Sequence, residues 1–240
     1  MSKICTSLLL VLAFLVMAGC ADLTIPDDWD TDLVLIGDSN TAISYFERTP
    51  QRRWSNIVAV ELGWTVVNLG RDGRTAEWFL ETNQLKAVAD YNAQYYLICL
   101  GLNDCKYYSA EQFEQKIKTL VGLLTANTSG QVILMTNVAV DYPDHHSFDR
   151  NTCTTEYDNA LRRTAAALNL PLIDIYYRFE RENTAGNWDT RIRTTNVWDA
   201  SQDSGQTVES GWFDDVHYNV TGNAIVAEEV IKFFERFPHH

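Results

Sequence analysis

The stretch Leu33-Val34-Leu35-Ile36-Gly37-Asp38-Ser39-Asn40 decides the fold class of this 240-residue chain. Four consecutive apolar residues are typical of a strand that is buried on both faces, as in a parallel sheet covered by helices. Gly37 permits the sharp turn that follows, and Asp38 and Asn40 are good turn formers. We therefore expect Ser39 at the carboxyl end of a buried strand, where it either caps a helix or takes part in chemistry.

Further apolar runs alternate with stretches of helical spacing along the rest of the chain. The predicted strands are 33–36, 65–69, 95–100, 132–135 and 172–175. The predicted helices are 55–62, 76–91 (with breaks), 155–168, 221–237 and one that Ser109 begins with Gln112 in a capping box. This alternation predicts an α/β fold of three layers, with a five-stranded parallel sheet between helices. The stretch 181–212 lacks regular periodicity and is expected to be a functional loop.

Two further motifs leave predicted strands at the same edge of this sheet, where function collects in parallel α/β folds. Residues 68–75 (Asn-Leu-Gly-Arg-Asp-Gly-Arg-Thr) form a glycine-rich turn, in which a glycine N–H can point outward. Residues 101–104 (Gly-Leu-Asn-Asp) follow the third strand and offer the side-chain amide of Asn103. Each motif alone is also consistent with an ordinary turn or cap.

The last motif is Asp214-Asp215-Val216-His217, near the far end of the chain. A serine hydroxyl needs a base to become a good nucleophile, and histidine works best as that base beside a carboxylate. Asp214 has the spacing that lets it turn toward His217, whereas Asp215 faces elsewhere in an extended segment. A metal site in the polar loop 144–146 (Asp-His-His) is a less favoured alternative. Ser39 and His217 together supply the reactive groups of a serine hydrolase.

These four blocks, in this order, resemble the SGNH hydrolase family, also called the GDSL-type esterases and lipases. The resemblance extends over about residues 33–234 and implies a flavodoxin-like order of the five strands. It implies that Ser39 attacks an ester carbonyl, that His217 takes its proton, and that Asp214 orients the histidine. The Gly-x-Ser-x-Gly turn of the α/β-hydrolases is absent from the sequence, which argues against that fold. No metal or organic cofactor is implied.

The same resemblance assigns an oxyanion hole to the N–H of Ser39, the N–H of Gly73 and the side chain of Asn103. Gly73 is preferred to Gly70, because the donor glycine of the family tends to lie five residues after the asparagine and before a serine or threonine. Asn40 stands where many members have leucine, and this variation is not expected to affect the chemistry.

The first 20 residues are expected to be an export signal rather than part of the fold. Lys3 is followed by an apolar run, 8–17, that is too short for a stable membrane anchor. The end of this segment resembles a bacterial lipoprotein signal in which Cys20 is lipidated; an ordinary secretory signal is the alternative. Residues 21–30 would then be a tether and 31–240 the catalytic domain. We expect an outer-membrane or cell-surface location, with a periplasmic or secreted one as the alternative.

The formal net charge of −13 argues against nucleic acid as a partner. An exported protein is held in an oxidising compartment, where loop cysteines form disulfides. Cys105 and Cys153 both fall in predicted loops and are candidates for such a bridge, whereas Cys99 lies in a predicted strand as a core thiol.

The substrate class follows from the loop before His217 and from the second block. Trp188, Trp198 and Trp212 are candidate platforms for sugar rings, although tryptophan also serves ordinary packing. Residues 73–75 (Gly-Arg-Thr) are similar to the Gly-Arg-Ser of the rhamnogalacturonan acetylesterase branch. We therefore expect an esterase that removes acetyl groups from a carbohydrate. The alternatives are a short-chain lipase, thioesterase, lysophospholipase or acyltransferase, or a surface module that binds glycan without catalysis.

Overall fold

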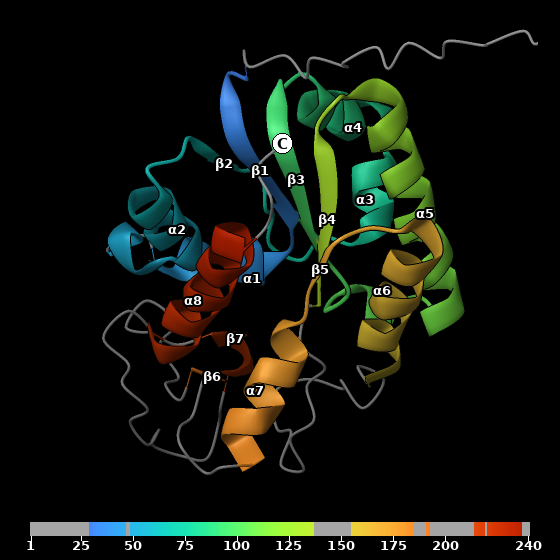
Figure 1. Cartoon of the computed structure of the whole chain (residues 1–240). Helices are drawn as coiled ribbons and strands as arrows, with labels where there is room; N and C mark the ends of the chain where they lie inside the picture. The colour runs from blue at the N-terminus through green and yellow to red at the C-terminus, as the bar shows by residue number, and fades with distance from the viewer. Residues whose placement is uncertain are drawn as a thin grey trace, which may run out of the picture.

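A central sheet lies between two layers of helices in the computed structural model of the chain (Figure 1). The structure describes residues 29–46, 49–136, 155–184, 191–192, 214–218 and 220–236. The strands are β1 (Thr31–Gly37), β2 (Val66–Asn68), β3 (Ala93–Cys99), β4 (Gln131–Met135), β5 (Leu172–Ile173), β6 (Arg191–Ile192) and β7 (Asp214–Tyr218). The helices are α1 (Ser39–Ala42), α2 (Trp54–Leu62), α3 (Ala76–Leu80), α4 (Thr82–Ala89), α5 (Ala110–Asn127), α6 (Thr155–Leu168), α7 (Ile175–Thr184) and α8 (Val220–Arg236). Short 3-10 turns are η1 (Ser44–Phe46), η2 (Pro50–Arg52) and η3 (Asp104–Lys106).

The large sheet has five parallel strands in the order β2-β1-β3-β4-β5. This is the flavodoxin-like order, so the predicted three-layer α/β fold is confirmed. Gly37 at the end of β1 pairs in register with Cys99 at the end of β3. The loops that begin after these two residues therefore leave the sheet at the same level.

Alternate residues of the strands feed two separate cores. Leu33 and Leu35 of β1 face the side of the sheet that α2, α7 and α8 cover, whereas Val34 and Ile36 face the side that α3, α4, α5 and α6 cover (Figure 1). All four side chains are completely buried. Burial on both faces explains why the strand reads as an unbroken apolar run.

The predicted helices are present, with two details that the sequence anticipated. The capping box at the start of α5 is formed: Ser109 Oγ accepts from the N–H of Gln112 at 3.3 Å, and Gln112 Oε1 accepts from the N–H of Ser109 at 2.9 Å. The helix expected over 76–91 is broken into α3 and α4, because Glu81 adopts an extended conformation with ψ 133.

The predictions after β4 need two corrections. Ile175 was expected to end the fifth strand, but it begins α7, because Asp174 Oδ1 accepts from the N–H of Tyr177 at 3.2 Å and caps the helix. The stretch 181–212 was expected to be a loop. It includes the end of α7 and also β6, which pairs with β7 as a two-stranded antiparallel sheet.

Several predictions lie outside the described residues. They concern the export signal at 1–20, nearly all of the tether, Cys20, Cys153, the loop 144–146, and the three tryptophans 188, 198 and 212. Cys99 is buried and free, as expected, and burial raises the pKa of its thiol well above the usual value. Cys105 is disulfide-bonded, and its partner is not among the described residues. In the part of the chain that the structure describes, no helix is long and apolar enough to cross a membrane.

Candidate active site

The first and last blocks of the sequence meet in space. Asp38 follows β1 and caps α1, since its Oδ1 accepts from the N–H of Asn40 at 3.0 Å, so Ser39 becomes the first residue of the helix. His217 lies in β7, and its Nε2 is 2.8 Å from Ser39 Oγ, although the two residues are 178 positions apart. Ser39 is 7% exposed. At this distance the hydroxyl and the imidazole share one proton through a direct hydrogen bond.

Buried asparagines fix the strand that carries His217. Asn40 Oδ1 accepts from the N–H of Tyr218 at 3.3 Å, and Asn223 Nδ2 donates to the carbonyl of Tyr218 at 3.2 Å. Asn223 Oδ1 also accepts from the N–H of Trp54 at 3.1 Å. Asn40 was not predicted to take part in the site, but its side chain joins α1 to β7. The one sequence signal was that asparagine stands here where many family members have leucine.

Asp214 begins β7, three residues before His217, and its side chain is outside what the structure describes. A regular strand turns residues three apart to opposite faces and residues two apart to the same face, so the expectation that Asp215 faces away from His217 in an extended segment does not follow from strand geometry. The pairing of β7 with β6 is irregular, however, because Asp214 pairs with Ile192 and Tyr218 pairs with Arg191. Irregular pairing of this kind is associated with a local bend of the strand.

The loop after β2 packs on α1 and presents two different glycines. The N–H of Gly70 donates to Asn68 Oδ1 at 3.0 Å, and a Cβ atom at Gly70 would lie 2.5 Å from the backbone nitrogen of Ala42. Gly73 has a φ of +71 and open space where a Cβ would stand. Its N–H forms no hydrogen bond with the residues that the structure describes. Gly70 therefore serves close packing, and Gly73 keeps a donor available.

The loop after β3 is tied to the loop after β2 by two side chains. Asn103 Nδ2 donates to the carbonyl of Arg74 at 3.2 Å, and Asp104 Oδ1 accepts from the N–H of Ala76 at 2.9 Å. Asn103 is 6% exposed, and its amide nitrogen carries a second N–H. These bonds tie Asn103 to Arg74, the residue after Gly73, and Asp104 to the start of α3.

Asp104 is a second residue beside the site whose part was not predicted from the sequence. It is completely buried, and its Oδ2 has no hydrogen-bond partner among the described residues. Burial raises the pKa of this carboxyl from 3.8 to about 7, and the negative charge of Asp38 adds to the rise, while the hydrogen bond from Ala76 opposes it. The sequence shows that the third block ends in an aspartate. It does not show that this aspartate is buried, because the burial depends on how α3 and η3 pack.

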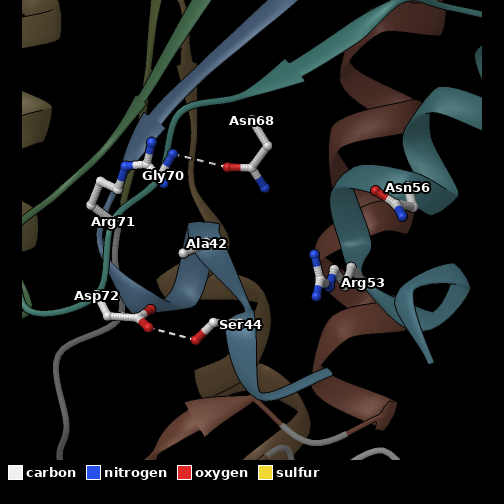
Figure 2. A pocket seen from close by; sticks show the side chains of 8 residues that line it. All are labelled: Ala42, Ser44, Arg53, Asn56, Asn68, Gly70, Arg71 and Asp72. Carbon is white, nitrogen blue, oxygen red and sulfur yellow. Dashed lines mark hydrogen bonds between the residues drawn. The ribbon is translucent and has the colours of Figure 1, made fainter. Parts of the chain in front are cut away.

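A polar cavity of about 440 Å³ opens between α1, the loop after β2 and the start of α2 (Figure 2). We call it the arginine pocket. Its lining residues are Ala42, Ser44, Arg53, Asn56, Asn68, Gly70, Arg71 and Asp72. Within the described parts of the chain, no group of three or more acidic, histidine or cysteine side chains is placed to hold a metal ion.

The segment that carries Ser39 and His217 matches a known protein family. The model of the GDSL-like lipase/acylhydrolase family matches residues 35–225. The chain belongs to this family. It is accordingly a carboxylic ester hydrolase, and the resemblance that the four sequence blocks carry is confirmed. A search of curated proteins found no significant match.

Solved structures of similar fold include other GDSL-type proteins. A lipolytic protein of the G-D-S-L family from Veillonella parvula has a TM-score of 0.63 and 19% identity, over 86% of this chain and 99% of that one. The acetylxylan esterase Axe2 from Geobacillus stearothermophilus has a TM-score of 0.62 and 18% identity, over 88% and 96%. The acetyl xylan esterase AlAXEase has a TM-score of 0.61 and 21% identity, over 84% and 98%. At these identities the likeness establishes the GDSL-type fold of the chain.

Proposed function

We propose that this GDSL-type hydrolase is a serine esterase that removes acetyl groups from a carbohydrate. The observation that carries the proposal is the 2.8 Å contact between Ser39 Oγ and His217 Nε2 at the carboxyl edge of the sheet. Two of the similar structures are acetylxylan esterases by name, and this supports an acetylated sugar as substrate. Longer acyl esters, thioesters and transfer of the acyl group to another alcohol are the alternatives within the family.

In the first half of the reaction, Ser39 Oγ attacks the carbonyl carbon of the ester while His217 Nε2 accepts the hydroxyl proton. The carbonyl oxygen takes up the negative charge. The imidazolium then gives its proton to the sugar oxygen as the carbon–oxygen bond breaks, and the acetyl group stays on Ser39. Asp214 is proposed to orient His217 and to stabilise the imidazolium.

In the second half, a water molecule attacks the acetylated Ser39, and His217 accepts one of its protons. Collapse of the tetrahedral intermediate releases acetate and returns the proton from His217 to Ser39 Oγ. No group other than the side chains already named has to carry a proton, because one imidazole acts as base and then as acid in each half.

Three donors are proposed to stabilise the negative oxygen in both halves: the N–H of Ser39, the N–H of Gly73 and the side-chain amide of Asn103. Their hydrogen bonds are strongest when charge develops on the oxygen, which is the requirement for lowering the barrier. Gly70 is the poorer choice, because its N–H already donates to Asn68 Oδ1. The bond from Asn103 to the carbonyl of Arg74 holds the amide in place and leaves its second N–H for the oxyanion.

The proposal includes export. Residues 1–20 would be removed as a lipoprotein signal, and a lipid on Cys20 would hold the enzyme at the outer membrane or cell surface. Large acetylated polysaccharides are found outside cells, so this location suits the substrate. Trp188, Trp198 and Trp212 remain candidate sugar platforms.

The test is hydrolysis of p-nitrophenyl acetate and release of acetate from acetylated xylan. Ser39→Ala and His217→Ala should each lower kcat by about 10⁴-fold, and the double variant should lose little more, since the two residues act as a unit. Ser129→Ala is the matched control, because Ser129 is exposed in the turn before β4, at the opposite edge of the sheet. A wild-type protein with no activity on any short acyl ester, or a Ser39→Ala variant with full activity, overturns the proposal.

A further inference from the structure

The arginine pocket carries positive charge that no described acidic side chain pairs with. Arg53 and Arg71 line it from opposite walls, Arg53 at the start of α2 and Arg71 in the loop after β2 (Figure 2). Arg53 Nε is buried and has no hydrogen-bond partner among the described residues. Neither guanidinium forms an ion pair with any described residue. Two guanidinium groups that no described carboxylate pairs with are suited to bind an anionic ligand in the cavity that they line.

The other polar groups of the pocket are already engaged. Asp72 accepts from the hydroxyl of Ser44 at 2.5 Å. Asn68 donates to the carbonyl of Thr41 at 2.6 Å and accepts from the N–H of Gly70 at 3.0 Å. With two arginines and one aspartate in its wall, the pocket has a net charge of +1 in a chain whose formal net charge is −13. The positively charged N-terminal end of α2, which Arg53 and Asn56 flank, adds to this local field.

The pocket adjoins the reactive serine. Ala42, in its wall, is the last residue of the short helix that Ser39 begins, so about 5 Å of helix rise separates the two. Asp72, also in the wall, directly precedes Gly73. The wall of the pocket therefore begins within about the length of one sugar ring from Ser39. The volume of about 440 Å³ lies within the range of small-molecule sites, about 300–1,000 Å³.

We infer that the arginine pocket binds the carboxylate of a uronic acid residue in the acetylated glycan, so that the enzyme prefers acidic over neutral substrates. This inference rests on the proposed esterase function. A guanidinium offers a planar pair of N–H donors that matches the two oxygens of a carboxylate. A uronic acid supplies that carboxylate on a sugar ring next to the ester-bearing sugar, whereas a neutral xylan chain offers only uncharged oxygen acceptors.

The experiment compares two acetylated xylo-oligosaccharides, one with a glucuronic acid branch and the other with the same carboxyl group reduced to an alcohol. The wild type should have the higher kcat/KM on the acidic substrate. In the double variant Arg53→Gln with Arg71→Gln, the acidic-to-neutral ratio of kcat/KM should fall about 10-fold or more, as expected for the loss of one charged hydrogen bond. Arg236→Gln removes the same charge at the exposed end of α8 and should leave the ratio unchanged.

A binding measurement separates this inference from the esterase proposal. Calorimetry with the Ser39→Ala chain measures the Kd of the acidic oligosaccharide without turnover, and the two arginine changes should weaken it about 10-fold or more. Arg53→Lys keeps the charge but loses the planar pair of donors, so it should weaken binding while circular dichroism reports an intact fold. If the wild type hydrolyses p-nitrophenyl acetate but the double variant keeps the wild-type ratio and Kd, the carboxylate site is refuted and the esterase stands. If no ester is hydrolysed, the esterase proposal fails, and the calorimetric Kd still decides the site.

Discussion

Asp104 should make the stability of this protein fall as the pH rises, which is the opposite of the usual behaviour of an aspartate. The pKa of its carboxyl is about 7 in the folded state and 3.8 as an unperturbed group. The native state therefore holds a proton that the unfolded state has lost between these two values. The free energy of unfolding decreases with pH wherever the native state binds more protons.

The magnitude follows from the shift. One pKa unit corresponds to about 1.4 kcal/mol, so a rise from 3.8 to about 7 costs about 4 kcal/mol once the pH is well above 7. Below pH 4 the cost is absent, because the carboxyl is protonated in both states. An asparagine at this position retains an oxygen that accepts from the N–H of Ala76 but does not titrate. In the variant Asp104→Asn this contribution to the pH dependence should disappear.

The assay is urea unfolding of the wild type and Asp104→Asn at intervals from pH 4 to pH 8. The difference in unfolding free energy between the two proteins should change by about 4 kcal/mol over this range, in favour of the variant at high pH. Asp30→Asn is the matched control, because Asp30 is exposed, and its pH dependence should follow that of the wild type. If wild type and Asp104→Asn give parallel lines from pH 4 to pH 8, the carboxyl is not protonated in the folded protein and the reasoning is refuted.

Three substitutions test how the loops hold the site. Gly70→Ala places a Cβ 2.5 Å from the backbone nitrogen of Ala42, so it should cost at least about 1–3 kcal/mol of stability and also lower kcat by moving α1. Gly73→Ala meets no atom within 4 Å and should cost only the strain of its φ of +71, about 1–2 kcal/mol. Urea unfolding compares the two glycines, and a Gly70→Ala variant as stable as the wild type contradicts the packing argument. Asn40→Leu removes the hydrogen bond between the N–H of Tyr218 and Asn40 Oδ1 and should cost about 0.5–1.5 kcal/mol, with kcat falling more than KM rises. Equal loss in kcat and in substrate affinity would speak against a positioning role.

The fold was predictable because its signals are local. Each long buried strand is an unbroken apolar run, and the capping box at Ser109 lies within four residues of sequence. The two-residue strand 172–173 carries too few residues to show where it ends, and the helix that begins at Ile175 was missed for this reason. The two-residue strand β6 was not predicted, because it is a strand only through its pairing with β7, which lies far along the sequence.

The reactive pair was predictable from sequence, but the groups that hold it were not. Ser39 and His217 stand in recognisable blocks, and the fold brings them to 2.8 Å. The contact from Asn40 to the strand of His217 joins residues 178 positions apart, and no spacing rule reaches that far. The pKa of Asp104 depends on burial, which the sequence of its block does not reveal.

Single side chains reinforce the loops at this edge of the sheet, where the backbone also contributes the hydrogen bond from the N–H of Arg71 to the carbonyl of Gly37 at 3.0 Å. Asn103 holds one loop through the carbonyl of Arg74, and Asp104 holds it through the N–H of Ala76. A carboxyl group does this at the cost of burial, because the free energy of unfolding falls between about pH 3.8 and pH 7, where the native state keeps a proton that the unfolded state has lost. An asparagine would avoid the cost of ionisation, but it would add an N–H at a place where the carboxyl oxygen has no partner. The stability that Asp104→Asn gains at high pH should therefore be accompanied by a looser Asn103 and a lower kcat, because Asp104 shares one short turn with Asn103, a proposed oxyanion donor.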